Sequence, residues 1–202
     1  MMRKFIFLVF FIFSLTAGTV MAADINGRLG ITGKVGFAVP LQDDFITGAT
    51  DSKTGLAAGG GLIYGLSKNL AAELDITQVP TIDLEVDGLK VGEAAFTDVS
   101  LGLQYRFTPD NSLVPYLGAG VDFITGDFQY QSGQKFDFEW TTGGHINAGV
   151  DYFVTKGVAL TAEIKGVFAP KADVKGTASE YDPTSFLGTV GVRLFLPENM
   201  FR

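Results

Sequence analysis

The feature that most constrains this chain is a repeated alternation, with a period of two residues, between apolar and polar or small side chains. From Ile25 to Val39 every second residue, beginning with Ile25, is apolar or glycine, and the residues between them include Arg28 and Lys34. Such alternation is typical of a β-strand with two different faces, because successive side chains point to opposite sides of a strand. The pattern therefore predicts an all-β fold.

Seven further segments alternate in the same way. The eight expected strands cover residues 25–39, 56–66, 70–79, 95–107, 115–125, 138–153, 158–168 and 186–195. Many reach the roughly 9–11 residues that a tilted membrane-spanning strand requires. Short turns at 67–69, 108–113 and 155–157 alternate with long loops near 41–54, 79–93, 126–137 and 169–184. This asymmetry favours an eight-stranded, antiparallel, up-and-down transmembrane β-barrel in a bacterial outer membrane, with the long loops outside.

The composition of the two strand faces distinguishes a membrane barrel from its main rival, a secreted soluble barrel of the lipocalin type. A soluble barrel would turn its polar face to water, where glycine only weakens a strand. Here the polar faces are rich in glycine, and the chain has 26 Gly and 18 Phe with only 18% charged residues. Small residues suit the narrow interior of an eight-stranded barrel, and aromatic residues near strand ends suit membrane interfaces. We therefore expect polar side chains inside and apolar side chains outside.

The N-terminus has the form of a secretory signal. Arg3 and Lys4 precede an apolar, Phe-rich stretch, and small residues ending at Ala22 and Ala23 follow. We expect cleavage after Ala22 or Ala23, which gives a signal peptide over 1–22 and a barrel over 23–202. The alternative is a retained anchor helix, but the apolar stretch is short for spanning a membrane. Without Arg3 and Lys4 the net charge falls from −7 to −9, which disfavours nucleic acid as a partner.

Three segments carry a resemblance to a known family. They are Leu101-Gly102-Leu103-Gln104-Tyr105-Arg106-Phe107, Pro115-Tyr116-Leu117-Gly118-Ala119-Gly120-Val121 and Ala148-Gly149-Val150-Asp151-Tyr152-Phe153. With them the chain resembles the OmpW family of small outer-membrane barrels. The last strand, 189–196, is similar to the C-terminal signal read by the barrel-assembly machinery, although Leu194 and Leu196 stand where aromatic residues are usual. The resemblance implies an apolar path for small hydrophobic molecules that opens sideways into the lipid.

A set of ionisable residues falls on the strand faces expected to point into the lumen. These are Arg28, Lys34, Glu73, Asp75, Asp98, Arg106, Asp122, His145, Asp151, Glu163, Lys165 and Arg193. Apart from His145, six are acids and five are bases, so two interpretations compete. The set is either a selectivity filter or a salt-bridged plug, and the balance of signs favours the plug because buried charges persist mainly when they are paired.

Two single residues invite sharper hypotheses. His145 is the only histidine, and it would be the base of a lipid-modifying enzyme if a nucleophile stood beside it, but Asn147 occupies the nearby inward position. We therefore expect His145 to be a hydrogen-bonding lumen residue. Trp140 is the only tryptophan and lies near the outer end of a strand, where interface anchoring is the simpler account. An apolar entrance formed by Phe45, Ile46, Phe128 and Trp140 is the alternative.

The remaining expectations concern ligands and partners. One histidine and no cysteine leave no plausible metal or cofactor site, and the loop acids lack the spacing of a Ca²⁺ loop. Outer-membrane lipid and lipopolysaccharide, the assembly machinery and small apolar solutes are the expected partners, and a closed barrel has no free edge, so we expect a monomer. The sequence leaves three functions open: passive transport of small hydrophobic molecules, a plugged structural barrel with partner-binding loops, and a lipid-modifying enzyme.

Overall fold

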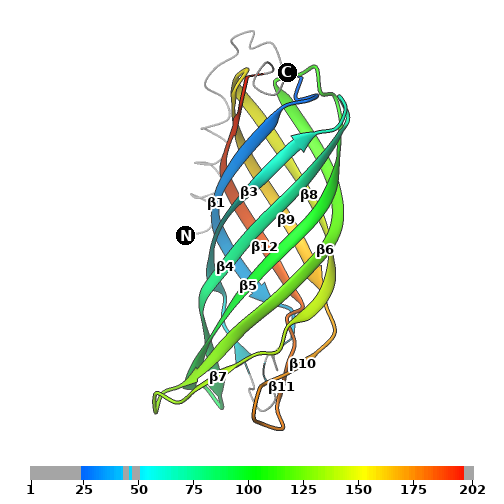
Figure 1. The fold of residues 1–202 in the computed structure, drawn as a ribbon. Helices are drawn as coiled ribbons and strands as arrows, with labels where there is room; N and C mark the ends of the chain where they lie inside the picture. The colour runs from blue at the N-terminus through cyan, green and yellow to red at the C-terminus, as the bar shows by residue number, and fades with distance from the viewer. Residues whose placement is uncertain (1–23, 43–45, 47–50, 198–202) are drawn as a thin grey trace, which may run out of the picture.

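The computed structural model describes residues 24–42, 46 and 51–197, so the expected signal peptide lies outside the described residues. Within them, eight long antiparallel strands close into a barrel (Figure 1). The strands are β1 (Leu29–Pro40), β3 (Gly55–Gly65), β4 (Leu70–Val86), β5 (Leu89–Arg106), β6 (Leu113–Tyr130), β8 (Thr141–Thr155), β9 (Val158–Phe168) and β12 (Ser185–Phe195). Each pairs with the next along the chain, and β1 closes the ring against β12. The predicted eight-stranded barrel is confirmed.

The two faces of the strands are sorted as a lipid-facing barrel requires. Apolar side chains point outward, as shown by the exposed fractions of Ile31 (50%) and Leu117 (54%), whereas Asp122 (0%) and Arg193 (2%) are enclosed. This is the reverse of a soluble barrel, whose apolar face would point inward. Among the described residues no helix is long and apolar enough to span a membrane.

Glycines on the inner face let neighbouring strands approach closely. A β-carbon at Gly36 would lie 2.0 Å from the carbonyl oxygen of Gly188, and one at Gly61 would lie 2.2 Å from that of Leu74. On the outer face, Gly33 has open space around it. Glycine is thus required where the tightly curved wall brings backbone against backbone.

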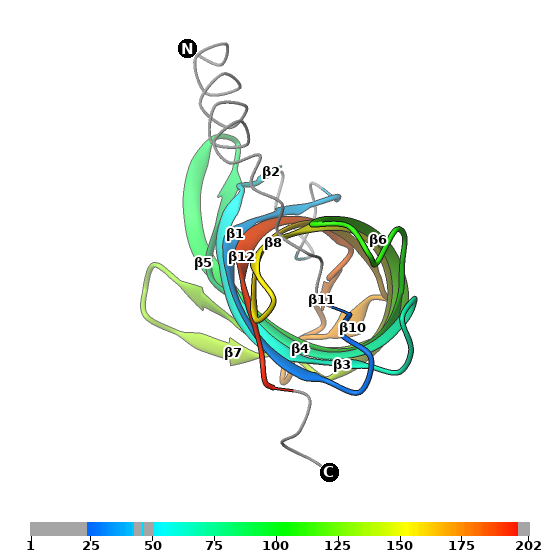
Figure 2. The ribbon, with the colours of Figure 1, turned by 90° about the horizontal axis from the view of Figure 1, so that it is seen from above.

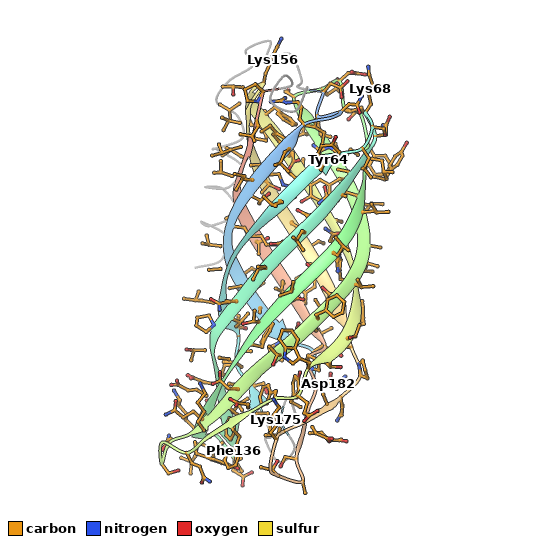
Figure 3. All side chains as sticks on the ribbon, viewed as in Figure 1. Tyr64, Lys68, Phe136, Lys156, Lys175 and Asp182 are labelled. Atoms are coloured by element: carbon orange, nitrogen blue, oxygen red, sulfur yellow. The ribbon has the colours of Figure 1, made fainter. Side chains whose placement is uncertain are left out.

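The two ends of the barrel differ. Lys68 and Lys156 mark the short-turn end, and Phe136, Lys175 and Asp182 lie at the opposite, long-loop end (Figure 3). In outer-membrane barrels short turns face the periplasm and long loops face outward. The long-loop end carries four short strands: β2 (Asp51–Ser52), β7 (Lys135–Asp137), β10 (Ala172–Asp173) and β11 (Glu180–Tyr181).

Two of the expected long loops are strands instead. The prediction of a loop over 79–93 is wrong, because β4 and β5 continue to a tight hairpin at Asp87 and Gly88, whose φ angles are 51° and 78°. Asp-Gly is a strong hairpin signal that the sequence already contained. The loop expected over 126–137 is likewise a hairpin of β6 with β7. Strands that extend beyond the membrane need no apolar outer face. These segments therefore carry charged residues and resemble loops in the sequence.

The tip of the β4–β5 hairpin is held by charges. The Lys90 ammonium lies 2.7 Å from an Asp83 carboxylate oxygen and 2.5 Å from one of Glu93. The hydrogen bond to Asp83 is the main cause that raises the pKa of Lys90, and the hydrogen bond to Glu93 is the next largest. The hairpin therefore carries a charged, solvated face outside the membrane.

Two strands begin later than expected. The first strand begins at Leu29 rather than Ile25, because Gly27 adopts a left-handed turn with φ of 70°. The sixth begins at Thr141 rather than Phe138, because Phe138 forms an isolated bridge to Val174 in the last long loop.

Candidate functional site

The structure places all twelve expected lumen residues inside the barrel. Eleven are buried, and the side chain of Glu73 is 12% exposed. Eleven lie on strands at positions where the alternation turns the side chain inward, Arg28 lies just before β1, and β3 contributes none of them. The interior wall is therefore charged around the middle of the barrel, except along β3.

Arg193 lies at the centre of one group of charges. Its guanidinium donates to Glu73 Oε1 at 2.9 Å and to Asp151 Oδ2 at 3.0 Å. Arg106 approaches the same Asp151 oxygen at 2.8 Å. One fully enclosed carboxylate is thus shared by two arginines, which compensates charges that would otherwise be costly to bury.

A second group gathers around Lys165. Its ammonium contacts Asp98 at 2.7 Å and Asp122 at 2.8 Å. The Nδ1 atom of His145 lies 2.9 Å from the other Asp122 oxygen. His145 is therefore a hydrogen-bonding member of the lumen network.

Lys34 completes the network by contacting Asp75 directly and Glu163 at 3.6 Å. Each of the six lumen carboxylates consequently has a basic partner. A hydrated ion moving along the axis would have to separate these pairs inside a narrow, enclosed space. This pairing is the one expected of a salt-bridged plug, and we call the network of paired charges the plug.

Three uncharged polar residues outside the predicted lumen set donate hydrogen bonds to carboxylates of the plug. The hydroxyl of Tyr116 donates to Glu163 at 3.0 Å while its ring lies 5.0 Å beneath the Arg193 guanidinium. Asn147 donates to the same Glu163 oxygen at 2.8 Å, and Gln104 donates to Glu73. All three occupy positions that the alternation turns inward, but the predicted lumen set was limited to ionisable residues and so left them out.

An apolar inner seal closes the short-turn end. Its buried members are Ile25, Ile63, Ala71, Val114, Phe153, Ala159 and Phe195. Arg28 sits here rather than in the plug: it donates to the carbonyl oxygens of Lys156 at 2.7 Å and Leu196 at 3.0 Å. Arg28 therefore ties the end of the last strand to a neighbouring turn.

An apolar outer compartment fills the barrel on the other side of the plug. Its buried members are Ala38, Ile46, Ala57, Val79, Ile82, Leu84, Ala94, Phe96, Ile124, Phe128, Phe138, Val167, Val174, Tyr181 and Leu187. Most belong to the barrel strands, whereas Phe138 lies between β7 and β8, and Ile46, Val174 and Tyr181 come from two other long loops. The lumen thus changes from charged to apolar toward the long-loop end.

The wall beside the outer compartment contains a break in the strand pairing. The β3–β4 ladder ends at Ala58 opposite Gln78, and pairing resumes only where Lys53 donates its amide to the Asp83 carbonyl. Pro80 lies in the break, and proline has no amide hydrogen for the ladder. We call this break the seam. Ala57 and Val79 face the compartment here, and Leu56 is 77% exposed on the outer side.

The residues expected to form an apolar entrance do not all gather. Phe45 lies outside the described residues, and Ile46 and Phe128 are buried in the outer compartment. Trp140 points outward with an exposed fraction of 62%, which places it apart from them and suits an interfacial anchor. Across the described residues, no group of three or more metal-ligating side chains is arranged to hold an ion.

Comparison with known proteins agrees with this architecture. A curated relative, the uncharacterized outer-membrane protein y4mB of Sinorhizobium fredii, is 30% identical over 112 residues, which cover 52% of this chain and 48% of that protein. The match thus spans about half the length of that relative.

Solved structures show the same fold. OprG from Pseudomonas aeruginosa superposes with a TM-score of 0.70 at 16% identity, over 86% of this chain and 98% of that one. Neisserial surface protein A superposes with a TM-score of 0.63 at 17% identity, over 84% and 97% of the two chains.

A family model supplies the broader assignment. The model for the outer membrane protein beta-barrel domain matches residues 5–193, nearly the whole chain. This chain belongs to the outer membrane protein beta-barrel domain family.

Proposed function

We propose that this outer-membrane barrel gives small hydrophobic molecules a passive, sideways route, as in the OmpW family that it resembles. Molecules would enter the outer compartment from the long-loop end and leave through the seam into the outer leaflet. The observation that carries the proposal is the interrupted β3–β4 pairing at Pro80, directly beside an apolar compartment.

The plug is the reason for a sideways rather than an axial route. An apolar molecule that moved further inward would meet the shared carboxylate of Asp151 and its two arginines. Separating buried ion pairs costs several kcal/mol each, and an apolar solute offers nothing in exchange. The outer compartment instead offers it aliphatic and aromatic surface.

The position of the seam suits delivery into lipid. Gly65 ends β3 at the short-turn side, and Leu56 lies nine residues away from it along the strand, toward the long-loop end. A membrane-spanning strand uses about 9–11 residues, so the seam falls within the last part of the span. The outward Leu56 and Pro80 would then meet acyl chains of the outer leaflet.

A disulfide across the seam tests the route. A β-carbon at Gly55 would lie 2.6 Å from Val79 Cγ1, so cysteines at these positions fall within disulfide reach. The chain has no native cysteine to interfere. A matched control links Leu62 to Leu74, which are already paired on the same two strands.

The assay measures entry of para-cresol and of a sugar into vesicles with a lipopolysaccharide outer leaflet. We expect para-cresol entry to stop in the oxidised Gly55→Cys/Val79→Cys variant, to return on reduction, and to persist in the control. The sugar is excluded throughout. Unchanged para-cresol entry through the oxidised seam variant would contradict the route.

A second candidate is favoured by the hairpins at the long-loop end. The β4–β5 and β6–β7 hairpins expose Leu89 (74%) and Tyr130 (46%), which suits a barrel that anchors a partner-binding surface. A folded barrel that admits neither solute would favour this function. We assign no catalytic role to His145, because it is buried inside the plug, where a lipid substrate would have to displace the ion pairs.

A further inference from the structure

The last long loop folds back into the barrel mouth and closes the outer compartment. Strands β10 and β11 form a small hairpin that lies within the outline of the ring when the barrel is viewed along its axis (Figure 2). Val174 and Tyr181, with exposed fractions of 3% and 0%, are its contributions to the compartment. Pro170 and Pro183 bracket the hairpin and restrict the backbone at its two ends.

Tyr181 occupies a slot that fits a phenol. Its ring stacks on Phe138 with centroids 4.1 Å apart and planes inclined by 16°. Its hydroxyl donates to the Glu139 carbonyl oxygen at 2.9 Å and approaches that of Ile124 at 3.4 Å. Burial raises the pKa of the Tyr181 hydroxyl, so it remains a neutral donor.

The hydroxyl partners of Tyr181 belong to the wall, whereas Tyr181 belongs to the hairpin and its backbone bridges to Ile46. Ile124 lies on β6, and Glu139 follows β7, which is itself paired with β6. The hairpin has two pairs of its own, Ala172 with Tyr181 and Asp173 with Glu180. Isolated bridges join Val174 to Phe138 and Tyr181 to Ile46, and amide-to-carbonyl bonds join Lys175 to Asp137 and Glu139 to Asp173. Such sparsely bonded elements open before the strands of a barrel do.

We propose that the slot is a binding site for small phenols, and that Tyr181 holds it shut until a phenol displaces it and swings the hairpin outward. The proposal rests on the proposed function, and it names the class of molecule that the outer compartment prefers. A phenol restores both the stacking on Phe138 and the hydrogen bond to Glu139 that Tyr181 gives up. A hydrocarbon of the same shape would leave that carbonyl without its donor.

Thiol labelling of a hairpin residue tests the displacement. In Val174→Cys the thiol is enclosed while the hairpin is closed, and a water-soluble maleimide reaches it only when the hairpin opens. We expect para-cresol to raise the labelling rate about tenfold or more, and para-xylene, which lacks only the hydroxyl, to have little effect. The matched control is Ala178→Cys, because Ala178 is exposed in the same hairpin. This variant should label rapidly whether para-cresol, para-xylene or neither compound is present.

Three results would overturn the proposal. The first is an equal increase in labelling with para-cresol and para-xylene, and the second is no increase with either compound. The third is rapid labelling of Val174→Cys without any phenol, because Tyr181 would then not hold the hairpin shut. In the Tyr181→Phe variant, which lacks the hydroxyl, the labelling rate without phenol should rise.

The labelling is done on barrels in detergent micelles, where there is no bilayer to cross. It therefore reports binding alone. A seam that fails to pass para-cresol would refute the transport route and leave the labelling result unchanged. Loss of the phenol preference in labelling would leave the seam result unchanged.

Discussion

Replacing Asp151 with alanine removes the carboxylate that two enclosed arginines share. Asp151 is 0% exposed, and its Oδ2 lies 2.8 Å from Arg106 and 3.0 Å from Arg193. Arg193 keeps its contact with Glu73 at 2.9 Å after the change. Arg106, which is 1% exposed, loses the carboxylate it contacts and keeps the ring of Tyr116 at 5.9 Å. The cost therefore falls mainly on Arg106.

The magnitude follows from what remains buried. Removing one partner of a buried ion pair costs about 3–5 kcal/mol, because the other charge stays enclosed without compensation. We expect Asp151→Ala to lower the free energy of unfolding within that range. Replacing both partners, as Asp151→Leu with Arg106→Met, should recover most of the loss, because no uncompensated charge is then left.

Reversible urea unfolding in detergent micelles measures these values, with folding read from gel mobility and Trp140 fluorescence. The control is Lys68→Ala, which removes a pair with Asp110 at 3.7 Å between side chains that are 60% and 78% exposed. Exposed pairs contribute about 0–1 kcal/mol. If Asp151→Ala cost no more than Lys68→Ala, the plug would not be the stabilising network described above.

Further predictions concern the wall and its closure. Gly36→Ala should lower the free energy of unfolding by about 1–3 kcal/mol, because the new methyl group meets the Gly188 carbonyl. Gly33→Ala on the open outer face should leave the free energy of unfolding unchanged or raise it. Urea unfolding compares the two variants. Arg28→Ala should cost about 1.5–3 kcal/mol through its lost charged hydrogen bonds to main-chain carbonyls. It should also speed hydrogen exchange at the Leu196 amide, which bonds to Leu29 where the barrel closes, and unchanged exchange there would argue against a closing role.

The alternation in the sequence determined most of the fold. The sequence predicts Val158–Phe168 to the residue, because the segment alternates strictly and begins directly after the short turn at 155–157. The same parity identified the inward position of residues such as Arg193 and Tyr116. The alternation does not predict which inward residues of different strands lie close together. The sharing of Asp151 by arginines on β5 and β12 therefore became visible only in the closed barrel.

The features at the long-loop end were harder to foresee. Hairpin strands outside the membrane carry charges on the face that lipid would otherwise cover, so the segment ending at Asp87 resembled a loop. The seam depends on a single residue, Pro80, whose effect shows only when its neighbours on β3 are known. Tyr181 was hidden because a residue in a long loop gives no sequence signal that it folds back into the core.

The most direct test of this account is single-channel recording of the refolded wild-type barrel in a planar bilayer. The central claim is that the ion-paired plug closes the axis and leaves only a sideways route for apolar molecules. It predicts no steady conductance, since every lumen carboxylate is engaged with a basic side chain. A large, steady conductance from the folded wild-type barrel would contradict the claim and indicate an open aqueous pore.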